Sequence, residues 1–201
     1  IETALKGGYD HFMLKEIYEQ PEVLDKTIHE YLKNGEFIGL PDLTKYNRID
    51  IVACGSAYNV GCIAKFIFED YANAEVNTYI ASEYRYKKNF LDEKSLLTVI
   101  SQSGETADTL ASLRLVKEKG VDTLAIVNVV GSSIAREAKD VLYIKAGPEI
   151  AVATTKAFTA QCALLSLLAF KMANDKKLLS EEDKKNIINS FYSIGDDADN
   201  L

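Results

Sequence analysis

The sequence predicts an α/β fold, in which a five-stranded parallel sheet flanked by helices forms a flavodoxin-like three-layer sandwich after an N-terminal helix pair. Two observations lead to this prediction. Apolar, β-branched runs of strand length alternate along the chain with amphipathic helical patterns, an order that builds parallel sheets with right-handed crossovers. The runs also lack polar alternation, as expected for strands that are buried on both faces.

The amino-terminal part is expected to contain a loop and two helices. Gly7 and Gly8 disfavour a helix over residues 1–9. An amphipathic pattern covers residues 10–20, and Pro21 separates it from a second one. We assign residues 1–40 to this linker and helix pair, and residues 41–201 to the domain that contains the sheet.

Strands and helices alternate through the rest of the chain. The helical stretch at 154–173 is apolar nearly all round and should be largely buried, and Ser180 opens a last, amphipathic helix. Strands are expected at residues 48–54, 76–81, 96–101, 123–127 and 141–144, and further helices at 59–71, from 106 and from 133.

The composition argues against several classes of protein. Of the 201 residues, 47% are hydrophobic and 26% charged, as in soluble globular domains, and the formal charge of −7 argues against nucleic-acid or acidic-membrane partners. Cys54, Cys62 and Cys162 lack CxxC spacing, which favours reduced, buried thiols in a cytoplasmic protein. We expect no membrane-spanning run and no signal peptide, and the start at Ile1 suggests a piece of a longer protein.

One loop is a candidate ligand site. The strand that ends at Ser101 passes through Gln102, Ser103 and Gly104 into a helix that begins near Thr106. Free backbone N–H groups at a helix start favour an anion, and the side-chain hydroxyls and amide add neutral donors. The loop therefore predicts a phosphate site without a fixed positive charge. Ordinary capping and turn residues are the alternative interpretation.

Three polar turns follow strands in this chain, at residues 55–57, 101–106 and 128–133. The carboxyl ends of parallel strands share one edge of the sheet, so we expect these turns on one rim, near a topological switch point. Glu149 and Lys156 flank the turn that follows the last expected strand, at residues 141–144, and are further candidates for ligand contact. Surface or capping roles are the alternative for both.

Several familiar site motifs are absent from the sequence. No GxGxxG turn follows the first strand, which argues against a nicotinamide or flavin cofactor, and no P-loop or GxSxG elbow is present. No cluster of His, Cys and carboxylates has metal-ligand spacing. We therefore expect neither cofactor nor metal. His11 and His29 lie in helical patterns and are expected to have surface or packing roles.

Five segments resemble a known family. The segments "CGSAYN", "SQSGETADTL" and "AVATTKAFTAQ" resemble the sugar isomerase (SIS) domain family. More narrowly, "HFMLKEIYEQP" and "IASEYRY" resemble the glutamine–fructose-6-phosphate aminotransferases, also called glucosamine-6-phosphate synthases. The resemblance implies the first SIS domain of the isomerase part, with a glutaminase domain before it and a second SIS domain after it.

The resemblance also implies site residues. Ala57 stands where the family often has a hydroxyl residue, which leaves its backbone N–H as the donor. The family's catalytic acid–base residues belong to the second SIS domain and the carboxyl-terminal tail, so no catalytic residue is expected in this chain. The implied phosphate contacts are Ser56, Ser101, Gln102, Ser103 and Thr106, with Gly55 beside them and Val152 near the sugar.

The parent reaction of that family converts fructose 6-phosphate and glutamine to glucosamine 6-phosphate and glutamate. By resemblance, this chain binds fructose, glucose or glucosamine 6-phosphate without turning it over, contacts the two other domains and is cytoplasmic. A homodimer is also expected, since the helix at 154–173 and the amino-terminal helix pair offer apolar surface. Two alternatives remain: a sugar-phosphate-sensing regulatory module, and a stand-alone phosphosugar isomerase with Glu149 as its base.

Overall fold

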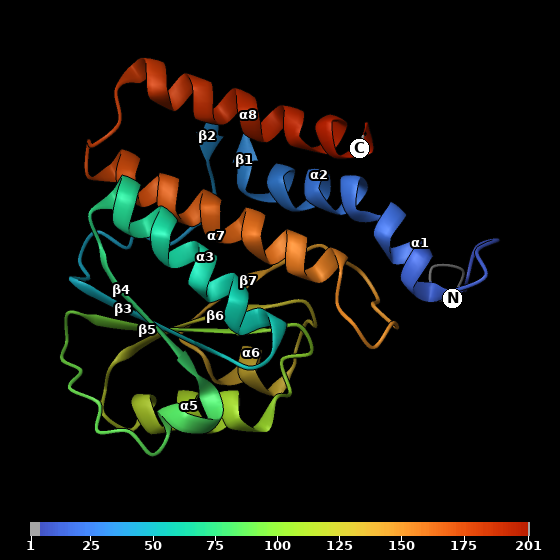
Figure 1. Ribbon diagram of the computed structural model, residues 1–201. Coiled ribbons are helices and arrows are strands. Elements are labelled where there is room, and N and C mark those ends of the chain that lie inside the picture. Colours follow the sequence, from blue (N-terminus) through green and yellow to red (C-terminus); the bar gives the residue numbers. More distant parts are fainter. Residues whose placement is uncertain (1–4, 201) are drawn as a thin grey trace.

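The computed structural model describes residues 5–200 and contains the expected parallel sheet (Figure 1). Within these residues the sheet has five strands in the order β4-β3-β5-β6-β7, and every neighbouring pair is parallel. The predicted fold class is therefore confirmed. Residues 1–4 of the expected amino-terminal loop, and residue 201, lie outside the described residues. The strands are β3 (Arg48–Ala53), β4 (Glu75–Ile80), β5 (Ser95–Ser101), β6 (Asp122–Val127) and β7 (Asp140–Tyr143).

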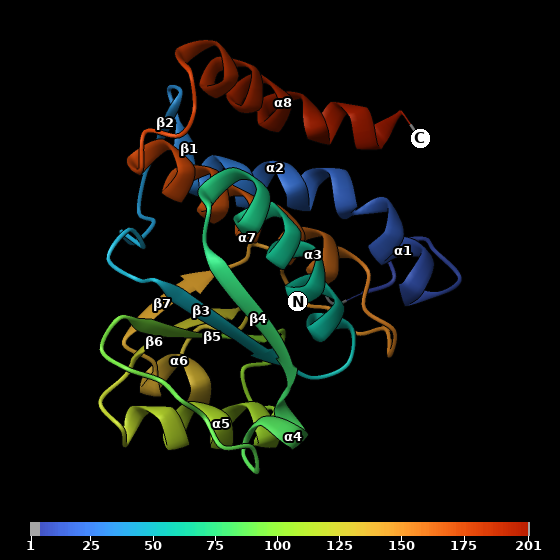
Figure 2. The ribbon, with the colours of Figure 1, turned by 60° about the vertical axis from the view of Figure 1, so that its left-hand side comes forward.

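Helices cover both faces of the sheet (Figure 2). On one face, α3 (Ser56–Ala72) packs beside α7 (Lys156–Asp175). Outside them, α2 (Gln20–Tyr31) packs on α7, and α8 (Glu181–Asp199) packs on α2. The other face carries the shorter helices α4 (Ala81–Tyr84), α5 (Ala107–Lys117) and α6 (Ser133–Glu137).

Side chains of the central strand alternate between two cores. Leu96 and Ile100 of β5 join the core under α3 and α7, whereas Leu97 and Val99 join the core under α5. Every residue of β5 is buried. The strand has no polar side because both of its faces are covered by helices, which explains the unbroken apolar run in the sequence.

Helix α7 lies at the centre of the larger core, as its all-round apolar sequence predicts. By length and composition alone α7 is a candidate membrane span, although Lys171 interrupts it, so that no uninterrupted apolar run of that length is present, as expected. However, 61% of its most apolar window is buried inside the protein, as in the core helix of a soluble protein. Because α2 and α3 cover α7, it does not supply the exposed apolar surface that we expected for a dimer.

The boundary between the first two helices differs from the prediction. Helix α1 (Phe12–Tyr18) is followed directly by α2, whose second residue is Pro21, so this proline begins a helix instead of separating two. Proline is tolerated in a first turn because the N–H groups there have no partner within the helix.

Two short elements were not predicted. A hairpin joins β1 (Leu32–Lys33) to β2 (Glu36–Phe37), and a single turn of helix, α4, follows β4. The hairpin turn, Asn34-Gly35, has positive φ at both residues, which is typical of two-residue turns. Strands of two residues carry too little apolar pattern to be recognised in a sequence.

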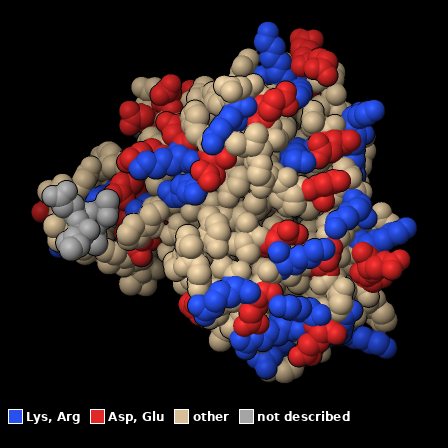
Figure 3. Space-filling model, turned by 180° about the vertical axis from the view of Figure 1, so that it is seen from behind, with Lys and Arg blue, Asp and Glu red and all other residues tan. Residues whose placement is uncertain are grey.

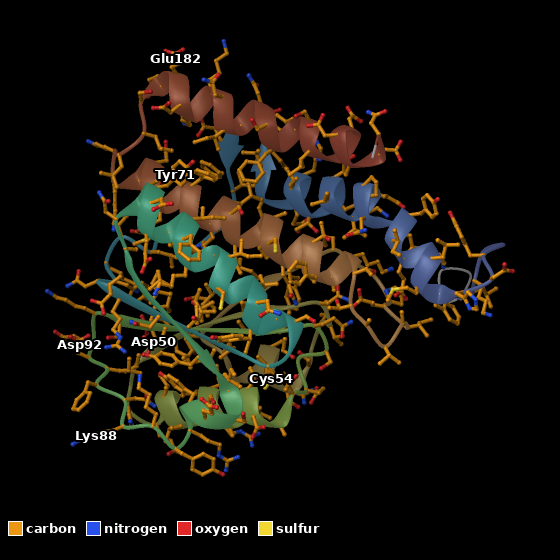
Figure 4. All side chains as sticks on the ribbon, viewed as in Figure 1. Asp50, Cys54, Tyr71, Lys88, Asp92 and Glu182 are labelled. Carbon is orange, nitrogen blue, oxygen red and sulfur yellow. The ribbon has the colours of Figure 1, made fainter. Side chains whose placement is uncertain are left out.

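A buried carboxylate fixes α4 on the sheet. Asp50 lies within β3 (Figure 4) and is fully buried. Arg48 Nε donates to it at 2.8 Å and the Tyr84 hydroxyl donates at 3.2 Å, which satisfies the buried charge. Burial, and then the neighbouring charge of Asp50, raises the pKa of Tyr84, so that this tyrosine remains a neutral donor.

Candidate functional site

A cavity of about 420 Å³ lies at the carboxyl ends of β3 and β5. The chain leaves β3 toward α3 on one face of the sheet and leaves β5 toward α5 on the other, so this is a topological switch point. The lining residues are Cys54, Gly55, Ser56, Ala57, Ile100, Ser101, Gln102, Ser103, Thr106, Glu149, Ala151, Val152, Ala153 and Thr154.

All of the candidate site residues named from the sequence line this cavity except Lys156. The Lys156 side chain is 5% exposed, and its Nζ lies 2.6 Å from Oε2 of Glu19, at the junction of α1 and α2. The positive charge of Lys156 is therefore paired with the Glu19 carboxylate inside the protein. This buried position contradicts the surface role considered for Lys156, whereas its capping role and its ligand contact stay predictions.

The loop from Ser101 to Thr106 is organised by its own hydroxyls. The Ser101 and Thr106 hydroxyls hydrogen-bond each other at 2.9 Å, and Ser101 Oγ accepts from the backbone N–H of Gly104 at 3.0 Å. Ser103 Oγ accepts from the Glu105 N–H at 3.2 Å, which leaves the Ser103 hydroxyl proton able to point elsewhere. The loop is therefore held in shape while donors remain for a ligand.

Backbone amides add to these donors. Helix α3 begins at Ser56 and α5 begins at Ala107, so both helix starts border the cavity. The first N–H groups of a helix lack partners within it, and the helix dipole makes this end partly positive. Among the described residues that line the cavity, Glu149 alone carries a charge. The arrangement suits a phosphate group without a fixed cation.

The third polar turn, at residues 128–133, supports the 101–106 loop through backbone hydrogen bonds. The N–H of Asn128 donates to Gln102 O at 3.1 Å, and the N–H of Ile134 donates to Gly104 O at 3.0 Å. The Glu105 carboxylate accepts from the N–H of Ser133 at 2.7 Å, and this hydrogen bond lowers the pKa of Glu105. The three turns thus share one rim, but the third supports the cavity without lining it.

A second cavity opens on the same rim. It measures about 630 Å³ and lies at the ends of β6 and β7. Gln102 and Glu149 line both cavities, so the two are neighbours. The turn at 128–133 contributes Asn128, Val129 and Val130 to this second space.

Glu149 caps the start of α7. Its Oε1 accepts from the N–H groups of Thr155 at 3.0 Å and Ala157 at 3.2 Å, and its Oε2 accepts from the Thr154 hydroxyl at 2.8 Å. These bonds occupy both carboxylate oxygens and place the negative charge at the positive end of α7. The capping alternative considered from the sequence is therefore correct, and Glu149 is not a lone carboxylate open to solvent.

The thiols and imidazoles contribute little to this site. Burial raises the pKa of the Cys162 thiol to about 11, so it remains protonated near neutral pH. Cys54, at the end of β3 (Figure 4), lines the cavity, and its Sγ accepts from the Thr109 hydroxyl at 3.9 Å.

The two histidines lie away from this cavity. His11 precedes α1 and His29 lies within α2, outside the cavity lining. Over residues 5–200 no three His, Cys, Asp or Glu side chains are grouped to hold a metal.

Some lining residues were missed by sequence analysis. Cys54 and Ile100 lie at or next to strand ends, where periodicity marks them only as core positions. Ala151, Ala153 and Thr154 belong to the segment around Val152, and membership of one quoted motif, "AVATTK", was the available signal.

The surface charge is mixed. Seen from behind, acidic and basic side chains are interspersed, and an uncharged area lies near the middle of this face (Figure 3). With the formal charge of −7, this face offers no pattern typical of binding to nucleic-acid phosphates.

Comparison with known proteins identifies the family. The model of the SIS domain matches residues 42–171, which is more than half of the chain. The chain belongs to the SIS domain family. A solved structure of the C-terminal domain of glucosamine-fructose-6-phosphate aminotransferase from Francisella tularensis superposes with a TM-score of 0.90 at 42% identity. The match covers 96% of this chain and 56% of that one.

Two curated relatives carry the related name glutamine–fructose-6-phosphate aminotransferase (isomerizing). The protein from Clostridium tetani is 48% identical over 98% of this chain. The protein from Caldanaerobacter subterraneus subsp. tengcongensis is 46% identical over 98% of this chain. The chain spans about a third of the length of these relatives, 34% and 33%. The narrower resemblance seen in the sequence is thus confirmed.

Proposed function

We propose that this chain holds a hexose 6-phosphate by its phosphate group, as the first SIS domain of a glutamine–fructose-6-phosphate aminotransferase. The main support is the cavity at the switch point, which is lined by two helix starts and by the hydroxyl-bearing residues Ser56, Ser103 and Thr106. Hydrogen bonds to a charged group contribute about 1.5–3 kcal/mol each, so a few neutral donors suffice to hold a phosphate.

The proposed phosphate contacts come from the starts of two helices, α5 and α3. Ser101, Gln102, Ser103 and Thr106 hold the phosphate from the start of α5, and Gly55, Ser56 and Ala57 hold it from the start of α3, Ala57 through its backbone N–H. The sugar then extends toward Val152, which is fully exposed on the loop before α7. Fructose, glucose and glucosamine 6-phosphate share the phosphate that this site recognises.

The parent enzyme would convert fructose 6-phosphate and glutamine to glucosamine 6-phosphate and glutamate. Its glutaminase domain and second SIS domain are the proposed partners within the longer chain, and relatives about three times as long as this chain support such a parent. The proposed location is the cytoplasm. We divide the chain into a linker and helix pair at residues 1–40 and the SIS domain at 41–201.

The two alternatives have weaker support. A stand-alone isomerase needs a base beside the sugar, and the carboxylate of Glu149 is engaged in capping α7. A sensing module remains compatible with the same cavity, but the two relatives at 46–48% identity are named as aminotransferases.

Calorimetric titration with glucose 6-phosphate tests the proposal. Ser103→Ala and Thr106→Val each remove one hydroxyl from the cavity and should weaken binding about tenfold, which corresponds to one charged hydrogen bond of about 1.5 kcal/mol. Ser190→Ala removes an exposed hydroxyl on α8 and serves as the matched control. Unchanged affinity in both loop variants, or an equal loss in the control, would place the site elsewhere.

A further inference from the structure

A buried carboxylate on α1 contacts the loop that lines the proposed sugar site. Glu16 Oε1 accepts hydrogen bonds from the backbone N–H groups of Ile150 at 2.6 Å and Ala151 at 3.2 Å. Its Oε2 lies 3.3 Å from the same Ala151 nitrogen. The loop beyond these amides, through Thr154, forms one wall of the cavity.

Glu16 is an unusual residue to bury. It is 2% exposed, and among the residues of α1 it is the one that is buried, whereas the apolar Leu14 and Ile17 are each 42% exposed. Burial of a charge is costly unless hydrogen bonds compensate it, and the two loop amides provide that compensation. The most buried side chain of α1 is therefore a carboxylate, while Phe12 and Met13 are only partly buried.

The same face of the helical segment makes two more contacts with α7. Glu19 pairs with the buried Lys156, and Gln20 Oε1 accepts from the Thr159 hydroxyl at 2.5 Å. Residues at i, i+3 and i+4 lie on one side of a helix, so Glu16, Glu19 and Gln20 act on adjacent points of the loop and of α7. In both ribbon views the loop before α7 lies next to α1 (Figures 1 and 2).

Two carboxylates thus hold the loop at separate points. Glu16 fixes the amides of Ile150 and Ala151, and Glu149 fixes those of Thr155 and Ala157. Val152, between these points, is fully exposed and lines the cavity. Without the Glu16 contact the segment before Val152 would lose its charged acceptor and its fixed position.

We propose that Glu16 is a positioning residue that sets the 149–155 loop against the sugar of the bound phosphosugar. This inference rests on the proposed function and goes beyond it, because it assigns a role in the site to a residue that does not line the cavity. Glu16 acts on the sugar end of the ligand, whereas the 101–106 loop holds the phosphate end. Its loss should therefore weaken binding of a sugar phosphate more than binding of inorganic phosphate.

The test compares Glu16→Gln with Glu22→Gln, a matched change of an exposed glutamate in the first turn of α2. Glucose 6-phosphate and inorganic phosphate are titrated against the 201-residue chain, with binding followed by NMR. Glu16→Gln should weaken glucose 6-phosphate binding about tenfold, leave inorganic phosphate binding unchanged and speed amide hydrogen exchange at Ile150 and Ala151. Glu22→Gln should change none of these.

The other outcomes separate the two proposals. If the wild-type chain binds neither ligand, the proposed function fails, and the role of Glu16 fails with it. If the wild type binds glucose 6-phosphate and Glu16→Gln binds it equally well, only the role of Glu16 is wrong. An equal loss of both ligands would show a general structural role instead. Should Glu16→Gln not fold, hydrogen exchange in the wild type decides, since fast exchange at Ile150 and Ala151 overturns the proposal.

Discussion

The tight approach of Gly104 to Ser132 makes the 101–106 loop sensitive to a single added methyl group. Gly104 has φ of +67°, and a Cβ added there would lie 2.0 Å from Ser132 Oγ and 2.5 Å from Ser132 Cβ. Gly104→Ala must therefore displace either the loop or the 128–133 turn that braces it. Gly120 has φ of +74° with nothing within 4 Å of an added Cβ, so Gly120→Ala is a control for the backbone effect alone.

The two variants differ by the cost of the steric clash. A left-handed conformation costs a non-glycine residue about 1–2 kcal/mol, partly offset by the lower entropy of the unfolded alanine variant. Overpacking of a buried site adds about 1–3 kcal/mol. We expect Gly120→Ala to lower the free energy of unfolding by about 1 kcal/mol, and Gly104→Ala by about 2–4 kcal/mol.

Urea unfolding followed by circular dichroism measures this difference, because the chain has no Trp to report by fluorescence. Calorimetry with glucose 6-phosphate then measures the site itself. A loop displaced at Gly104 should lose at least one charged hydrogen bond to the phosphate, so the affinity of Gly104→Ala should fall tenfold or more. If Gly104→Ala matches Gly120→Ala in both stability and affinity, the close approach to Ser132 does not shape the site.

Three further predictions follow from the structure. Hydrogen bonds from Lys139, Tyr46 and Lys45 lower the pKa of Asp122 to about 2 in the folded protein. The ionised carboxylate therefore stabilises the fold above the pKa of Asp122 in the unfolded chain, and this stabilisation is lost as the pH falls toward 2. Asp122→Asn should cost about 1 kcal/mol at pH 7, after allowance for solvent screening, and less at pH 3; a pH-independent cost would contradict this. The purified chain should not convert fructose 6-phosphate to glucose 6-phosphate, with or without glutamine or ammonia, and turnover abolished by Glu149→Gln would favour a stand-alone isomerase. Light scattering should give the mass of a dimer, through exposed apolar residues such as Ile63 and Phe66 on α3, and a single-chain mass at micromolar concentration would exclude it.

The local pattern of apolar and polar residues was sufficient to predict the parallel sheet and the edge of the sheet at which the polar turns meet. Buried parallel strands carry unbroken apolar runs, and the turns that follow them share an edge by topology, so Ser56 and Ser103 could be placed together although they are far apart in the sequence. The resemblance to known segments added Val152, which no periodicity marks.

Contacts between distant segments could not be predicted in the same way. Glu16 and the Ile150 amide are 134 residues apart, and nothing in "HFMLKEIYEQP" distinguishes the buried Glu16 from Glu19, which is partly exposed. Likewise, nothing in the sequence indicates that Lys156 pairs with Glu19 inside the protein. Such pairings depend on how α1 packs against the start of α7, and this packing leaves no local signal in either segment.

A crystal structure of the chain with glucose 6-phosphate tests the central claim most directly. The account predicts the phosphate at the starts of α3 and α5, within hydrogen-bond distance of the Ser103 and Thr106 hydroxyls, with the sugar toward Val152. A phosphate bound instead in the neighbouring cavity between Asn128 and Glu149, away from the 101–106 loop, would contradict it.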